Sequence, residues 1–153
     1  MSERKKHHPS IGWRERVSLP ELGIFGITAK TDTGARSSCL HAFHVEEFDK
    51  DDTPWVRFGV HPSRRSTFDE VWCEAKIIDK RLVKNSGGIE SHRYFIETQL
   101  QLGERIWKTE ISLADRETMG YRMLLGRTAI RHHYLVNPGR SFLQSRPKKR
   151  KKL

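Results

Sequence analysis

A chain of 153 residues, 35% of them hydrophobic and including 4 Trp, 7 Phe and 3 Tyr, is large enough for one folded domain, which excludes a disordered protein. No stretch approaches the roughly 20 apolar residues of a membrane helix, and the first residues lack the apolar core of a secretory signal, so we expect a soluble, cytoplasmic protein with no membrane partner. The net charge of +10 lies mostly at the two ends, because Arg146 to Lys152 carries six of these charges and Glu3 to Lys6 a further two, which leaves +2 from His7 to Ser145.

Both charged ends are predicted to be disordered, because like charges in a polar segment repel one another and cannot pack. We expect a basic arm over residues 1–10, a folded domain over residues 11–144 and a basic tail over residues 145–153. The domain holds two cysteines, Cys39 and Cys73. Two cysteines so far apart, in a reducing compartment, predict free thiols and no disulfide.

Within the domain, apolar residues recur at every second position more often than at helical spacing, which predicts strands with one buried face. The pattern is clearest in residues 55–60, 71–77 and 94–102. After the third of these segments a tight turn leads into residues 107–113, which again have one apolar face. These last two strands are therefore predicted to form a hairpin.

Shorter strands and one helix complete the predicted fold. The helix is a short segment that begins near Arg127. The shorter strands are predicted at Ile24–Lys30, Leu40–Phe48, Met123–Leu125 and Tyr134–Val136. Many short strands between turn signals predict an all-β fold, a closed or partly closed barrel.

The first candidate for catalysis is the tripeptide Asp32-Thr33-Gly34, which follows a predicted strand. The aspartate offers a carboxylate, the threonine hydroxyl can hydrogen-bond across a loop, and the glycine lets two backbones approach closely. The same residue types are also common in ordinary turns. Taken alone, the tripeptide favours a simple junction between a strand and a turn.

A second motif changes this interpretation. Leu124-Leu125-Gly126-Arg127 places an apolar pair and then Gly-Arg at the start of the short predicted helix. An Asp-Thr-Gly-Ala motif near the start of a small β-domain and this motif near its end resemble the retropepsin-like aspartic peptidases, over most of residues 19–143. The resemblance implies the acid protease fold, a closed β-barrel with one short C-terminal helix. It also assigns the loop at Ser86, Gly87 and Gly88 to the flap of that fold.

Within this superfamily, the chain looks most similar to small bacterial proteins labelled ATP-dependent zinc proteases, which are often associated with ATP-grasp glutamate ligases. The segments that carry this similarity are residues 19–23, 29–36, 113–119, 124–127 and 136–141. The chain has neither a glycine-rich phosphate loop for ATP nor a His-Glu-x-x-His helix for zinc. We therefore expect no cofactor.

Five residues could still suggest metal ligands: Cys39, His41, His44, His132 and His133. On one strand, Cys39 and His41 would face one side and His44 the other. The adjacent His132 and His133 diverge in either a strand or a helix. Ordinary strand and surface positions therefore explain these residues better than a metal site.

The resemblance implies hydrolysis of peptide bonds by a water molecule that is activated between two aspartates sharing one proton. The chain has one Asp-Thr-Gly, so a symmetric homodimer would bring two copies of Asp32 together. Thr33 would then contact the partner's loop, Gly34 would accept substrate backbone, and the loop from Ser86 to Gly88 would close as a flap. The residues expected to support the site are Leu125, Gly126 and Arg127.

The charges near the motif differ from those of typical retropepsins. Lys30 and Thr31 precede Asp32, where apolar residues are typical, and Arg36 follows Ala35, where an acidic residue usually pairs with an arginine such as the one after Gly126. More basic residues flank the predicted flap: Lys80, Arg81, Lys84 and Arg93. Such a site favours acidic peptides, unless these charges are solvated residues of an edge strand. The residues expected to bind substrate are Lys30, Ala35, Arg36, Lys84, Ser86, Gly87 and Gly88.

The similarity to proteins associated with glutamate ligases points to a glutamate-rich protein tail as the substrate, for example on a ribosomal protein. The basic C-terminal tail would then contact ribosomal RNA through phosphates. Two other functions stay open from the sequence. One is a catalytically silent retropepsin-like domain that binds ribosomes or nucleic acid through its basic termini, and the other is a zinc-dependent hydrolase.

Overall fold

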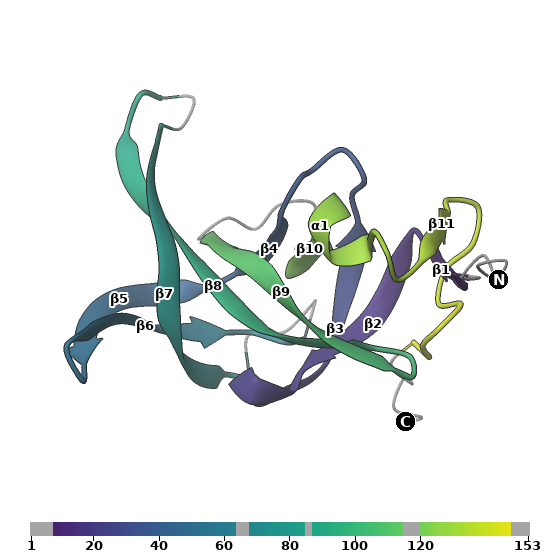
Figure 1. The fold of residues 1–153 in the computed structure, drawn as a ribbon, viewed down its shortest axis with the longest axis horizontal. Helices are drawn as coiled ribbons and strands as arrows, with labels where there is room; N and C mark the ends of the chain where they lie inside the picture. The colour runs from purple at the N-terminus through teal and green to yellow at the C-terminus, as the bar shows by residue number, and fades with distance from the viewer. Residues whose placement is uncertain (1–7, 64–67, 85–86, 115–119, 148–153) are drawn as a thin grey trace, which may run out of the picture.

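The structure is a computed structural model that describes residues 8–63, 68–84, 87–114 and 120–147 (Figure 1). Its described residues form eleven strands, one 3-10 turn (η1) and one short α-helix. Their bounds are β1 Ser10–Gly12, β2 Arg14–Leu19, η1 Pro20–Leu22, β3 Ile24–Thr31, β4 Ser38–His41, β5 Phe43–Lys50, β6 Thr53–Val60, β7 Val71–Lys84, β8 Glu90–Leu102, β9 Arg105–Ala114, β10 Met123–Leu125, α1 Arg127–Ile130 and β11 Leu135–Asn137.

Six strands close into a barrel. They are hydrogen-bonded in the order β2-β3-β10-β4-β9-β8, and Ser18 of β2 pairs with Gln101 of β8 to complete the circle. The strands β7, β6 and β5 continue the sheet outward from β8. The predicted all-β closed barrel with one short helix is confirmed.

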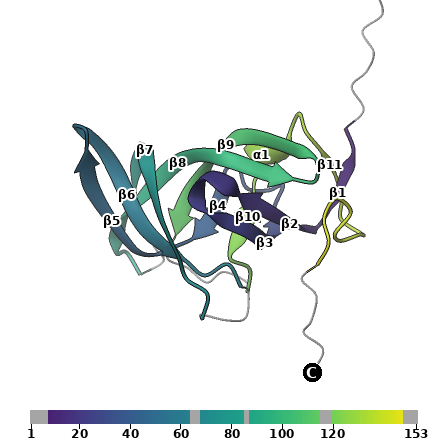
Figure 2. The same cartoon turned by 90° about the horizontal axis from the view of Figure 1, so that it is seen from below.

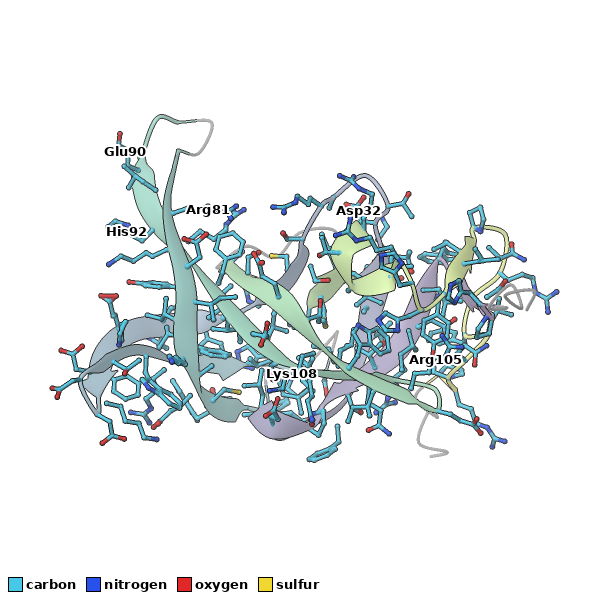
Figure 3. All side chains as sticks on the ribbon, viewed as in Figure 1. Asp32, Arg81, Glu90, His92, Arg105 and Lys108 are labelled. Carbon is cyan, nitrogen blue, oxygen red and sulfur yellow. The ribbon has the colours of Figure 1, made fainter. Side chains whose placement is uncertain are left out.

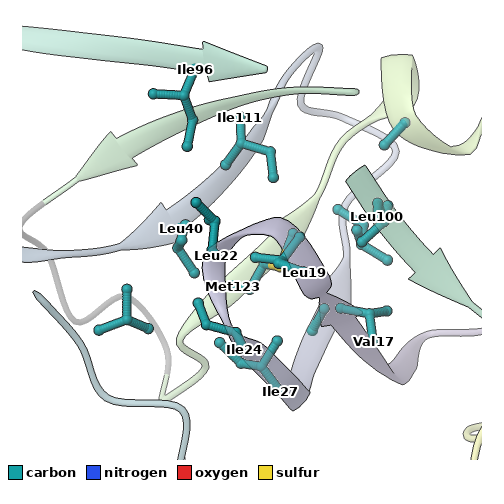
Figure 4. Close-up of a cluster of buried hydrophobic side chains, with 14 of the residues drawn as sticks. Val17, Leu19, Leu22, Ile24, Ile27, Leu40, Ile96, Leu100, Ile111 and Met123 are labelled. Atoms are coloured by element: carbon teal, nitrogen blue, oxygen red, sulfur yellow. The ribbon is translucent and has the colours of Figure 1, made fainter. Parts of the chain in front are cut away.

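The barrel core follows from the predicted alternation of apolar and polar residues. Ile96 of β8, Ile111 of β9 and Leu40 of β4 are fully buried, and Met123 of β10 packs with them (Figure 4). Val56, Phe58 and Val60 of β6 are also fully buried, so the outer sheet adds to the same core. Burial of each side chain of this size contributes about 1.5–3 kcal/mol to the stability of the fold. The apolar faces therefore decide the strand register.

The predicted strand Leu40–Phe48 is wrong in one respect, because the structure divides it into β4 and β5. The backbone of His44 takes a left-handed conformation with φ of 48°, and the pairing of β5 with β6 shifts register between Phe43 and Glu46. A bulge of this kind bends a strand. The break itself falls at Ala42, and β5 with its bulge belongs to the outer layer of β5, β6 and β7, which Figure 2 shows at the opposite end of the molecule from β1 and β11.

Contacts of the folded domain continue just outside the predicted domain bounds, residues 11 and 144. Ser10 pairs with Leu135 in the parallel β1–β11 sheet, and the Ser145 hydroxyl donates a hydrogen bond of 2.6 Å to the Glu15 carboxylate. Residues 1–7 of the predicted arm and residues 148–153 of the predicted tail lie outside the described residues. Among the helices of the described part, none is long and apolar enough to cross a membrane.

A buried carboxylate joins the two ends of the domain. Glu15 of β2 is fully buried, and it accepts hydrogen bonds from the backbone N–H groups of Gly12, Leu143 and Gln144, at 2.7, 2.7 and 3.0 Å, as well as from the Ser145 hydroxyl. These donors satisfy the charge that burial would otherwise leave without solvation. The segment before the basic tail is therefore held against β1 and β2.

Candidate active site

The loop that carries Asp32 leaves the barrel where β3 lies next to β10. The two strands are parallel, and Leu125 is the register partner of Thr31. The Asp32 N–H then donates to the Leu125 carbonyl at 2.8 Å, and the Ala35 N–H donates to the Asp32 carbonyl at 3.2 Å. The two motifs that carried the resemblance, distant in sequence, are thus in direct contact.

Asp32 is held in a local turn of its own loop. Its Oδ1 accepts a hydrogen bond of 3.0 Å from the Gly34 N–H, which is the pattern of an Asx turn. Within the part of one chain that the structure describes, this is the hydrogen bond that the carboxylate receives. The side chain is half-buried, while Thr33 and Gly34 are exposed, so the carboxylate can be reached from outside the barrel.

Arg127, the first residue of α1, fixes the other side of this loop. Its Nη1 donates to the carbonyl oxygens of Thr33 and Gly34, both at 3.0 Å, and its backbone N–H donates to the Ala35 carbonyl at 2.8 Å. The Thr128 N–H donates to the Arg36 carbonyl at 3.0 Å. Backbone carbonyls of the Asp32 loop therefore take the place of the acidic partner that the sequence lacks at position 36.

Gly126 allows α1 to approach the strand that follows the Asp32 loop. Its N–H donates to the Ser38 hydroxyl at 3.0 Å, and a Cβ at this position would lie 2.5 Å from the Ser37 carbonyl carbon and 2.6 Å from its oxygen. Both neighbours are backbone atoms that cannot rotate aside. Only glycine therefore fits between the two motifs without a shift of one of them.

Replacing Gly126 with Ala is expected to lower the free energy of unfolding by about 2 kcal/mol, because the added methyl group forces the backbones at Ser37 and Gly126 apart. Urea denaturation followed by circular dichroism measures the loss. Gly139→Ala is the matched control, because its new Cβ would lie no closer than 3.4 Å to a neighbouring atom, which is ordinary contact. Equal stability of the two variants would contradict this account of Gly126.

A third segment holds the end of β3 from the opposite side. The Thr31 N–H donates to the Trp13 carbonyl at 2.8 Å, and its Oγ1 donates to the Gly12 carbonyl at 2.9 Å. These contacts, like that of Ser38 with Gly126, join residues that are distant in sequence. The sequence contains no periodic or local signal for them, so they were not predicted.

Two of the remaining predicted site residues, Lys30 and Arg36, flank the Asp32 loop in the chain. Lys30 pairs with Leu124 in the sheet, and Arg36 is exposed just after the loop. Gly87 and Gly88 lie in the connection between β7 and β8, where Gly88 has φ of 80°. Ser86 and the side chain of Lys84 lie outside the described residues. In Figure 1, the β7–β8 hairpin extends from the barrel toward the same side as the loop between β3 and β4.

Cys39 and His44, two of the residues considered as metal ligands, lie in different environments. Burial raises the pKa of the Cys39 thiol on β4, although its hydrogen bond with Ser112 and the charge of Arg93 oppose the rise. His44 instead stacks on Trp72 in the outer layer, with ring centroids 6.2 Å apart. Among residues 8–63, 68–84, 87–114 and 120–147, no group of three or more His, Cys, Asp or Glu is arranged to hold a metal ion.

Cys73, the other cysteine, and the adjacent His132 and His133 lie at ordinary core and surface positions. Cys73 is a buried free thiol whose pKa is raised to about 12 by burial. His132 is exposed, and His133 stacks on Trp107 with ring centroids 4.2 Å apart. Burial and the nearby Arg105 lower the pKa of His133, which favours its neutral form.

Comparison with curated proteins finds relatives that are much longer than this chain. It is 42% identical over 132 residues to a protein of Shewanella pealeana named probable alpha-L-glutamate ligase. The aligned region covers 86% of this chain and 29% of that protein. A protein of Desulfotalea psychrophila with the same name is 43% identical over 128 residues, 84% of this chain and 28% of the relative. The chain thus spans less than a third of the length of these relatives.

A solved structure has the same fold. A protein of unknown function from Legionella pneumophila superposes with a TM-score of 0.73 at 26% identity, over 90% of this chain and 99% of that one. Residues 10–147, which include both motifs, match the RimB-like family, described as retropepsin-like aspartic endopeptidase RimB. The resemblance inferred from the sequence is confirmed, and the chain belongs to the RimB-like family of retropepsin-like proteins.

Proposed function

We propose that the chain is an aspartic endopeptidase whose active site forms between two copies, each contributing Asp32. The observation that carries the proposal is the way the Asp32 loop is held. Its backbone is fixed by Leu125 and Arg127, while its carboxylate remains accessible from outside the barrel. A reactive group on a rigid, exposed loop is what catalysis by positioning requires.

Two such carboxylates at short range share one proton, because like charges so close cannot both ionise. The ionised carboxylate takes a proton from a water molecule, whose oxygen attacks the carbonyl carbon of the peptide. The protonated carboxylate gives its proton to the carbonyl oxygen. When the resulting tetrahedral diol collapses, the C–N bond breaks and the protonated carboxylate gives its proton to the amine nitrogen. The ionised carboxylate takes the proton of one diol hydroxyl, so that the dyad again holds one proton.

A second copy is the best source of the second carboxylate. The chain has one Asp-Thr-Gly, and the other described aspartates have local roles. Asp79 bonds to Arg81 on β7, and Asp69 accepts from the Ser63 hydroxyl. The remaining described aspartates lie in or beside the turn between β5 and β6: Asp49, Asp51 and Asp52. A twofold axis near Asp32 would instead supply an identical group in an identical environment.

We also propose that the substrate is an acidic segment of a protein, such as a glutamate-rich tail. Lys30 and Arg36 lie on either side of the Asp32 loop, and positive charge at a site attracts acidic peptides. The curated relatives bear the name probable alpha-L-glutamate ligase, and a ligase of this name adds glutamate. The proposed reaction would remove what such a ligase adds.

A peptide containing a run of Glu is expected to be hydrolysed about 10-fold faster than the same peptide with Gln, at low ionic strength, because its charges are attracted to the site. The value of kcat/KM for each peptide is measured at low salt and again at about 0.5 M salt, where the difference should shrink by screening. Equal rates for the two peptides at low salt would contradict the proposed substrate. Hydrolysis of both would still support the peptidase.

A further inference from the structure

The sheet register places side chains from five strands in one row beside the candidate site. Directly paired residues of neighbouring strands point to the same face. The pairs link Lys30 to Leu124, Leu124 to Cys39, Cys39 to Ser112, and Ser112 to Phe95. Their chain neighbours Ala29, Met123, Leu40, Ile111 and Ile96 are buried in the barrel core. This site-side row therefore lies outside the barrel and begins two residues before Asp32.

At its far end, the row meets two arginines on the β7–β8 hairpin. Phe95 pairs with Asp79, and the next pair on the same face joins Arg81 to Arg93. The Arg81 Nε bonds to Asp79 Oδ2 at 2.8 Å, and its guanidinium carbon lies 4.4 Å from the centre of the Phe95 ring. In Figure 3, Arg81 points from β7 toward the side of Asp32, whereas His92 points the other way. The Arg81 side chain is thus oriented toward the proposed site.

Arg93 lies directly across from Arg81 in the strand pair. In the described part of the chain, no Asp or Glu forms a salt bridge with it. It is half-buried, and its charge reaches Cys39 in the middle of the site-side row. Like charges directly opposite each other destabilise a strand pair. A carboxylate between them would remove this repulsion and accept charge-assisted hydrogen bonds from both guanidinium groups.

We propose that Arg81 and Arg93 form a carboxylate-binding subsite that takes an acidic side chain of the bound peptide. The inference rests on the proposed function, because the site-side row leads from Asp32 to this pair. Asp79 and Phe95 hold Arg81 in position, while Arg93 supplies a charge that no Asp or Glu among the described residues neutralises in a salt bridge. The subsite makes recognition specific to one substrate position instead of depending on overall charge.

The subsite is tested by binding, in a form of the protein that does not need to cleave. In an Asp32→Asn background, the affinities of a Glu-containing peptide and its Gln counterpart are measured by fluorescence anisotropy. Both peptides have blocked ends, so that a terminal carboxylate cannot replace the side chain. Arg93→Gln is expected to weaken binding of the Glu peptide by about 10-fold or more and that of the Gln peptide by less than about 3-fold.

Lys108→Gln is the matched control, because Lys108 is an exposed cation on β9 away from Asp32 (Figure 3). It should leave the affinity ratio of the two peptides unchanged. Thermal unfolding should show that Arg93→Gln is at least as stable as the parent, since one of two facing like charges is removed. An added peptide with a free C-terminal carboxylate and Gln side chains shows whether the subsite takes chain ends instead.

The outcomes distinguish a failure of the proposed subsite from a failure of the proposed peptidase activity. If Arg93→Gln weakens both blocked peptides equally, or if Lys108→Gln changes their ratio as much, the subsite is wrong even where wild-type protein hydrolyses peptides. If only the peptide with a free C-terminus responds, side-chain recognition is wrong. If binding is selective as expected but wild-type protein cleaves nothing, the proposed function fails and the subsite stands.

Discussion

Replacing Asp32 with Asn is expected to lower the rate of peptide hydrolysis by about 10³-fold or more. The amide of Asn can still accept the hydrogen bond from the Gly34 N–H, so the loop keeps its conformation. The amide cannot take a proton from water, which removes general base catalysis, an effect of about 10²–10⁴-fold on its own. The rate of cleavage of a glutamate-rich peptide, followed from acid to neutral pH, measures the loss.

Asp52→Asn is the control for this substitution. Asp52 lies in the turn between β5 and β6 with φ of 60°, a conformation that Asn also tolerates. We expect wild-type activity from it. Adding a chelator to each assay separates the aspartic mechanism from a metal-dependent one. Activity that survives Asp32→Asn but disappears with the chelator would overturn the assignment of Asp32.

Replacing Glu15 with Gln is expected to reduce the free energy of unfolding by about 3 kcal/mol or more. The Glu15 carboxylate is fully buried and accepts four hydrogen bonds. Gln offers one acceptor oxygen, and its NH₂ group would face donors that it cannot satisfy. Each buried donor left without a partner costs about 1–3 kcal/mol. Urea denaturation at neutral pH provides the measurement.

Glu97→Gln is the control for this change, because Glu97 is exposed on β8 and its replacement should alter stability by less than about 0.5 kcal/mol. The effect of Glu15→Gln should also reach the candidate site. The Gly12 N–H donates to Glu15, and the Gly12 carbonyl accepts from Thr31, the residue before Asp32. A stability change as small as that of Glu97→Gln would contradict the role assigned to Glu15.

The strands that the sequence predicts well are those whose position depends on one apolar face. Residues 55–60, 71–77 and 94–102 all have their alternate apolar residues inside, because burial of those faces dominates the local energetics. β2 was not predicted, since its inward side chains include Glu15. In a sequence, a carboxylate predicts a surface position. The donors to Glu15 at residues 143–145 are distant from it in sequence and come close to it only in the folded chain.

The candidate site also has features that the sequence predicts and features that it does not. The sequence identifies Asp32 and the Leu-Leu-Gly-Arg motif through the family pattern, and the contact of Asp32 with Leu125 agrees with that pattern. The sequence does not identify the carbonyl partners of Arg127, because every residue type has a backbone carbonyl that can accept a hydrogen bond. The opposed pair of Arg81 and Arg93 also depends on strand register, which a bulge between Ile77 and Asp79 shifts.

In the proposed active site two chains supply one Asp32 each, and mixing wild-type protein with Asp32→Asn tests this arrangement most directly. Equal amounts are unfolded together in urea, refolded together and assayed for peptide hydrolysis. Random pairing leaves about one quarter of the dimers with two aspartates, so the activity should be about one quarter of that of the same total amount of wild-type protein. An activity of about one half would show that each chain works alone and would contradict the shared site.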